Sequence, residues 1–154
     1  MAYSAKEALR ILRIIHFSLM MGPAFFATVV FYLTVSGSNS QDPVEILTYV
    51  PGALFILSLP LSDFMFKMAK KELKNKSDLK SKVAVFQTAQ IIRMAILEMC
   101  ALFSAVVALI NGDIYQLIVV ALVIVFMAIK TPSVLMLETE LELSQEEKSQ
   151  FQTG

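Results

Sequence analysis

The chain has 154 residues, of which 56% are hydrophobic and 17% charged, and its formal net charge is zero. Soluble domains are typically about 45–50% apolar, so this composition, with a mean hydropathy of +0.68, favours a membrane protein over a soluble globular domain. The single cysteine excludes a disulfide framework or a thiolate metal site within one chain. Because the basic residues form no continuous face, we expect no nucleic-acid binding.

Four apolar segments predict four membrane-spanning helices, over residues 14–35, 46–66, 83–110 and 114–130. A span needs about 20 apolar residues, so the fourth segment is short, and we expect Lys130 to snorkel to the interface. Helices satisfy every backbone polar group internally, which a spanning segment requires. We therefore predict an all-α, integral membrane four-helix bundle in residues 1–133 and a cytoplasmic acidic tail in residues 134–154.

The positive charge predicts the orientation of the spans. Lys6, Arg10 and Arg13 precede the first span, and seven lysines lie in the loop between the second and third spans. The other two loops, at 36–45 and 111–113, contain no Lys or Arg. Since Lys and Arg remain on the cytoplasmic side, we expect a bacterial inner-membrane protein with both termini in the cytoplasm. The lysine loop is a topology determinant, or it also attracts anionic headgroups.

Four ionisable side chains lie within the predicted spans: His16, Asp63, Arg93 and Glu98. Counting from the outer helix ends at 1.5 Å per residue places Asp63 and Arg93 about 25 Å deep in a core about 30 Å thick. His16 is expected slightly nearer to the cytoplasm. We predict an ion pair between Arg93 and Asp63 with His16 adjacent, serving either as a structural contact or as a polar vestibule.

Glu98 is predicted in the middle third of the membrane, where an acid costs about 2.5–3.5 kcal/mol. It shares one helix face with small side chains that permit close packing between helices. These are Ala101, Ala105 and Ala108, and the corresponding stripe on the first span contains Ala24 and Thr28. We predict that Glu98 points at a packed interface. There it either stabilises the contact between helices or titrates on a proton or cation path.

Two prolines, Pro23 and Pro60, are placed in the first and second spans. Each removes a backbone donor and is expected to kink its helix or simply to be tolerated there. Residues 14–30 also align without gaps on residues 91–107, which are offset by half of the chain. This alignment predicts two duplicated helical hairpins related by a pseudo-twofold axis, or it is a chance likeness between apolar sequences.

The tail combines an apolar face with acidic side chains. Val134, Leu137 and Leu141 fall at helical spacing, and Ser144 begins a capping box over residues 144–147. We expect a solvated end, a segment that packs against the oppositely charged lysine loop, or a docking site for a protein partner.

Three segments resemble an uncharacterised family of small four-transmembrane-helix proteins of Bacteroidota type. They are residues 92–103 (IRMAILEMCALF), 130–132 (KTP) and 143–147 (LSQEE). In that family a glycine is commoner at the position of Met99. The resemblance covers most of the chain and implies the four-span architecture, without implying an activity.

No phosphate-binding loop, zinc pattern or nucleophile elbow is present in the sequence, so we expect no enzyme activity, cofactor or metal. Two functions remain open. The first is a non-enzymatic accessory, scaffold or homo-oligomeric component of the bilayer. The second is a small ion- or proton-coupled translocator that uses Glu98, with Arg93, Asp63 and His16 as its cytoplasmic vestibule. A bundle this small encloses little volume, so a solute path is expected between protomers.

Overall fold

The computed structural model describes residues 5–37, 44–76 and 78–141, and these residues are helical or in short turns, without strands. The elements in chain order are α1 (Ala5–Val35), α2 (Glu45–Lys70), the 3-10 helix η1 (Lys71–Asn75), α3 (Leu79–Asn111), α4 (Gln116–Ile129) and α5 (Val134–Glu140). The all-α prediction is therefore confirmed.

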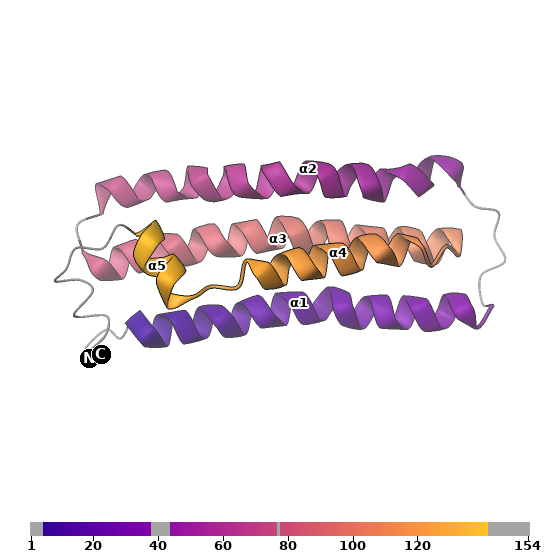
Figure 1. Ribbon diagram of the computed structural model, residues 1–154, viewed down its shortest axis with the longest axis horizontal. Helices are drawn as coiled ribbons and strands as arrows, with labels where there is room; N and C mark the ends of the chain where they lie inside the picture. Colours follow the sequence, from indigo (N-terminus) through magenta and orange to yellow (C-terminus); the bar gives the residue numbers. More distant parts are fainter. Residues whose placement is uncertain (1–4, 38–43, 77, 142–154) are drawn as a thin grey trace.

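The four longest helices run side by side, with α3 and α4 between α2 on one side and α1 on the other (Figure 1). Because α3 packs against α1, α2 and α4, 50% of its most apolar window is buried, against 17% for α1 and for α2. α3 is thus the central helix, and the other described residues leave the outer faces of α1 and α2 uncovered.

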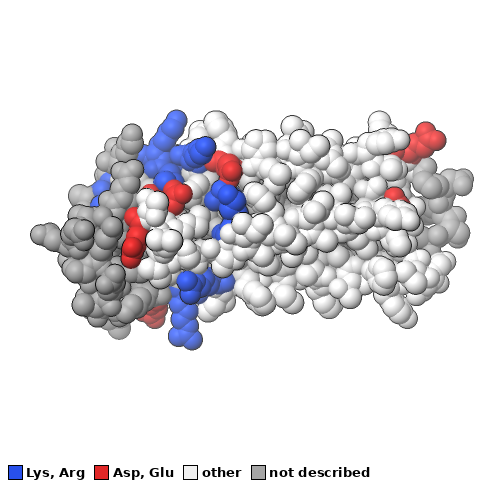
Figure 2. All heavy atoms as spheres, in the orientation of Figure 1, with Lys and Arg blue, Asp and Glu red and all other residues white. Residues whose placement is uncertain are grey.

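Three helical segments are long and apolar enough to cross a membrane: α1, α2 with its continuation into η1, and α3. α4 has 14 residues and passes this test only together with α5, from which it is bent by 74°. On the face shown in Figure 2, Lys and Arg gather at one end of the molecule and leave a broad belt without charged side chains. We call it the apolar belt, because the helices able to span contain long apolar windows. The chain is therefore a membrane protein with three to four helices able to span.

The helices extend beyond the predicted spans at the basic end. α2 continues to Lys70 and η1 follows it, so much of the predicted lysine loop is helical. α3 begins after Asp78, whose carboxylate accepts a hydrogen bond from the backbone N–H of Ser81 at 3.0 Å. This bond stabilises the charged form and holds the pKa of Asp78 below its usual value. At the other end Gly112 adopts a φ of 63° and ends α3 in a left-handed turn.

Two apolar cores stabilise the bundle. The central core lies between α3, α4, α1 and α2, and its buried members are Val30, Met94, Leu97, Cys100, Ala101, Ala105, Ala108, Val120, Val123 and Met127. The end core lies at the basic end, and its buried members are Ala8, Leu9, Leu12, Phe66, Val83, Phe86, Ala89, Leu137 and Leu141. The end core explains the longer helices, because their extra turns contribute apolar side chains to it.

α5 folds back onto the basic end and belongs to the end core. Leu137 and Leu141 are buried there, and Glu140 forms an ion pair with Lys70 of α2. Of the three expectations for the tail, packing against the lysine-rich segment is therefore confirmed for residues 134–141. The domain boundary at residue 133 stays a prediction, and the described residues on both sides of it contribute to one apolar core. The predicted capping box at 144–147 lies outside the described residues.

The two predicted hairpins are not equivalent in their packing. α3 and α4 pack directly together, whereas α1 and α2 lie on opposite sides of that pair. The lengths differ as well, since α2 has 26 residues and α4 has 14. A pseudo-twofold relation between equal hairpins would require matching contacts, so that prediction is wrong for this arrangement.

The prolines do not interrupt their helices. α1 continues through Pro23, and α2 continues through Pro60 and also Pro51 (Figure 1). Pro23 is buried and Pro60 exposed, so the two face different surroundings. A continuous helix is compatible with both expectations for these prolines, a kink or simple tolerance, so both stay open.

Candidate functional site

Arg93 and Asp63 form the ion pair that the sequence predicts, between α3 and α2. The two ends of the pair are unequal: the side chain of Arg93 is 6% exposed and that of Asp63 is 39% exposed. The guanidinium also lies over the Phe66 ring, 4.6 Å from its centroid, in a cation–π contact. The pair therefore stabilises the α2–α3 contact from the edge of the end core.

His16 makes its contact elsewhere. It is buried in α1, and its Nε2 lies 3.3 Å from the hydroxyl oxygen of Thr131, just after α4. Close by in the chain, Arg13 Nε donates to the carbonyl oxygen of Pro132 at 2.9 Å. The single polar layer expected from depth alone is thus divided. Asp63 lies on α2, while the face of α1 that carries His16 turns toward the end of α4.

Glu98 lies at the edge of the contact between α3 and α1, beside Gly22. A Cβ atom added at Gly22 would come within 3.2 Å of Oε1 of Glu98, so glycine leaves the space that this carboxyl group occupies. Glu98 is half-buried, and Gly22 and Met99 beside it are exposed. The prediction of a packed interface holds for one side of Glu98, and its other side faces outward.

Glu98 has no hydrogen-bond or ion-pair partner within the part of the chain that the structure describes. The sequence reasoning did not identify Gly22 as its neighbour. The sequence carries no local signal for this neighbour, because the residue of α1 that faces Glu98 depends on how the two helices pack.

The alanine stripe on α3 is buried as predicted. Ala101, Ala105 and Ala108 are each 0% exposed. The corresponding prediction for α1 is wrong at Thr28, which is exposed and donates to the carbonyl oxygen of Ala24 in its own helix at 2.9 Å, while Ala24 is half-buried. The inward face of α1 is instead a neighbouring series at helical spacing: Leu12, His16, Pro23 and Val30.

Enlarging this stripe is expected to destabilise the bundle. Ala105→Leu should lower the free energy of unfolding by about 1–3 kcal/mol, because the site is filled on all sides. Chemical unfolding in detergent, followed by circular dichroism, measures this change. Val106→Leu, at the adjacent exposed position, is the matched control and should change stability by less than about 0.5 kcal/mol. An equal effect of both variants would contradict close packing at Ala105.

Several buried polar residues were not singled out from the sequence. At the end of the bundle opposite the basic end, Asn111 Nδ2 donates to the Val44 carbonyl oxygen at 3.3 Å, and Gln116 Nε2 donates to that of Thr48 at 3.0 Å. At the basic end Gln90 Nε2 donates to the carbonyl oxygen of Lys130 at 2.8 Å. The bond from Gln90 satisfies a carbonyl at the C-terminal end of α4, whereas those from Asn111 and Gln116 join the end of α3 and the start of α4 to the first turn of α2. A polar residue near the end of an apolar segment is their sequence signal.

Among the residues described, no three of His, Cys, Asp and Glu gather closely enough to hold a metal ion. No family model, curated protein or solved structure matches the chain. The interpretation of the candidate site therefore depends on its own geometry, in which Arg93 has a partner within the chain and Glu98 has none among the described residues.

Proposed function

We propose that this protein is a non-enzymatic component of the bacterial inner membrane that acts as a homo-oligomer. Its core is a four-helix transmembrane bundle, the architecture that the resemblance to a Bacteroidota-type family implies, and both termini are in the cytoplasm. The observation that carries the proposal is the half-exposed Glu98 at membrane depth, next to a glycine on the flank of the bundle.

The proposed fourth span is α4 with its end turns. Its beginning is held at the outer end by the bond from Gln116 to Thr48, and its end is held by the bond from Gln90 to Lys130. Gln116 and Lys130 are 14 residues apart, which is about 21 Å along a helix, so α4 alone is shorter than a hydrocarbon core about 30 Å thick. In the proposed span the turn before Gln116 and the snorkelling side chain of Lys130 complete the crossing.

The proposed orientation follows from the charge distribution. Visible Lys and Arg side chains gather at the end of the molecule that carries α5, and the opposite end shows acidic side chains (Figure 2). Basic residues remain on the cytoplasmic side of inner-membrane proteins. This supports a cytoplasmic position for the basic end, where α1 begins.

Assembly is inferred from the difference between Arg93, which has a partner of opposite charge, and Glu98, which has none among the described residues. Arg93 has Asp63 within the same chain, whereas Glu98 reaches the surface of the bundle without a described partner. An acid that faces lipid is costly, and covering it with a second copy removes it from the hydrocarbon. Gly22 permits a close approach there, and exposed Phe25 and Met99 offer apolar contact area.

A second candidate function is proton- or cation-coupled translocation through the oligomer. It is favoured by the same unpartnered carboxyl group, since a titratable acid at membrane depth is a recurrent part of such paths. The central core of one chain is filled with apolar side chains such as Leu97 and Val123. A path would therefore run between copies, past Glu98.

The assembly is tested by native mass spectrometry of the protein released from its own membranes. We expect a homo-oligomer for the wild type. Both Gly22→Leu, which blocks the close approach, and Glu98→Gln, which removes the charge, should raise the dissociation constant about tenfold. Ala53→Leu, a small-to-large change on the exposed face of α2, should leave assembly unchanged.

A monomeric wild type would contradict the homo-oligomer. If Glu98→Gln leaves the oligomer intact but abolishes ΔpH-driven flux in proteoliposomes, the translocator is the better function. If a second protein is released with the chain in a fixed stoichiometry, the chain is a subunit of a mixed complex.

A further inference from the structure

The basic end contains a hollow lined by lysines. Its volume is about 420 Å³, and it lies between α2, η1, the start of α3 and the end of α5. Its lining is Lys67, Lys70, Lys71, Leu73, Lys76, Lys82, Glu140 and Leu141. The lining of this lysine pocket contains five lysines and one glutamate, and Glu140 pairs with Lys70. Like charges held together favour the binding of an anion.

The lysine pocket lies at the level expected for lipid headgroups. Lys67 directly follows the buried Phe66, where the apolar part of α2 ends. Lys82 directly precedes the buried Val83, where the apolar part of α3 begins. In the proposed orientation this is the cytoplasmic surface of the membrane, where anionic phospholipids attract basic side chains.

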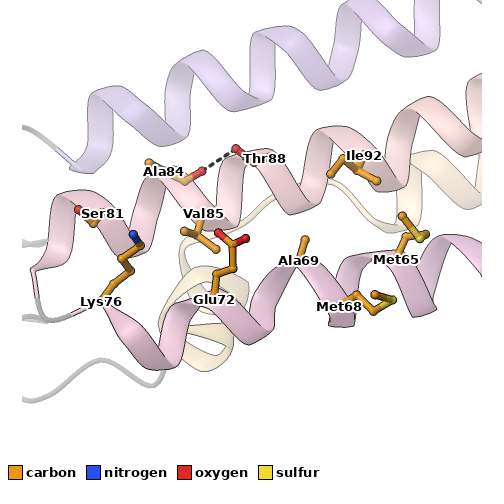
Figure 3. A pocket seen from close by; sticks show the side chains of 10 residues that line it. All are labelled: Met65, Met68, Ala69, Glu72, Lys76, Ser81, Ala84, Val85, Thr88 and Ile92. Carbon is orange, nitrogen blue, oxygen red and sulfur yellow. Dashed lines mark hydrogen bonds between the residues drawn. The ribbon is translucent and has the colours of Figure 1, made fainter.

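A second hollow adjoins the first, and Lys76 lines both. It has a volume of about 540 Å³ and lies between α2 with η1 and α3 (Figure 3). Lys76 and Ser81 are at one end of this α2–α3 groove, and Met65 and Ile92 are at the other (Figure 3). Its lining is mostly apolar between these ends, and Met65 and Ile92 lie within segments able to span the membrane.

We propose that the two hollows form one binding site for an anionic phospholipid of the cytoplasmic leaflet. The phosphate group binds in the lysine pocket, Lys76 lies at the junction, and an acyl chain lies along the α2–α3 groove. Glu72 adds a carboxylate to the groove, and with Glu140 it still leaves an excess of positive charge over both hollows. This excess selects an anionic lipid over a zwitterionic one. The site depends on the proposed orientation, and it does not depend on oligomerisation.

The experiment uses the delipidated full chain in detergent. Dioleoyl phosphatidylglycerol and dioleoyl phosphatidylcholine are added together in equal amounts, and native mass spectrometry counts the bound lipids. We expect preferential retention of phosphatidylglycerol. Lys76→Gln should weaken its binding about fivefold, since one lysine near the surface contributes about that factor. Lys80→Gln removes the same charge from a position that lines neither hollow, and should change binding by less than about twofold.

A variant in the α2–α3 groove shows whether the ligand is a lipid or a soluble phosphate compound. Ala84 is exposed and lines the α2–α3 groove, so Ala84→Trp should fill the groove without disturbing either core. It should weaken phosphatidylglycerol binding and leave glycerol 3-phosphate binding unchanged. If glycerol 3-phosphate binds as well as the lipid and Ala84→Trp affects neither, the ligand is soluble and the proposal is overturned.

Equal retention of the two lipids would also overturn the proposal, as would equal effects of Lys76→Gln and Lys80→Gln. The same spectra give the oligomeric state. Monomers that carry phosphatidylglycerol would refute the homo-oligomer while leaving the lipid site in place.

Discussion

Asp63→Ala is expected to lower the free energy of unfolding by about 3 kcal/mol, because it leaves the guanidinium of Arg93 buried without a carboxylate. The lost partner is on α2 and the stranded charge is on the central helix α3, so the change weakens the contact between these two helices. Unfolding of the detergent-solubilised protein with increasing sodium dodecyl sulfate, followed by circular dichroism, measures the effect.

The double variant Asp63→Ala/Arg93→Met is the control for this result. It removes both charges and keeps an apolar side chain beside Phe66, so its stability should return close to that of the wild type. An Asp63→Ala variant as stable as the wild type would mean that Arg93 reaches water without its partner. The Arg93–Asp63 pair would then be available for a vestibule rather than for stability.

Leu137→Ala is expected to be as damaging as the loss of Asp63, at about 3 kcal/mol. Leu137 is 0% exposed and lies in the end core with side chains of α1, α2 and α3, although it belongs to the short helix α5 near the end of the chain. Removing its side chain leaves a cavity among residues such as Leu12 and Phe86, which the surrounding helices cannot fill completely. The same unfolding measurement applies.

Leu135→Ala provides a matched control two residues away, since Leu135 is 73% exposed and should cost less than about 0.5 kcal/mol. If both variants lower the free energy of unfolding equally, or if neither lowers it, α5 is not fixed on the bundle. If the expected difference is found, residues 134–141 are part of the folded unit, and the lysine pocket beside Leu141 has a fixed wall.

The inferred sites divide the molecule by depth. The end core and the Arg93–Asp63 pair join the helices near the basic end, while Glu98 and Gly22 lie farther along α3 and α1, within the apolar belt. The stability variants should therefore leave the contact around Glu98 unchanged if the protein remains folded. Conversely, Gly22→Leu should alter assembly more than it alters the free energy of unfolding.

The sequence alone determined the four long helices and the pairing of Arg93 with Asp63. A long apolar segment in a membrane must satisfy its backbone hydrogen bonds internally and therefore forms a helix, so the order of the long helices could be predicted. The Arg93–Asp63 pair could also be predicted, since opposite charges at one depth attract each other once their helices are adjacent. The alanine stripe on α3 follows from helical periodicity, which is local information.

Only the tertiary structure decided which helices are neighbours and how each is rotated. Counting residues gives one coordinate, the depth, and it could not show that His16 contacts Thr131, that Thr28 faces outward or that Gly22 makes room for Glu98. It also could not place Leu137, because α5 reaches the end core through a sharp bend after α4. These features depend on contacts between distant segments, and the packing of the whole bundle selects them rather than any local pattern.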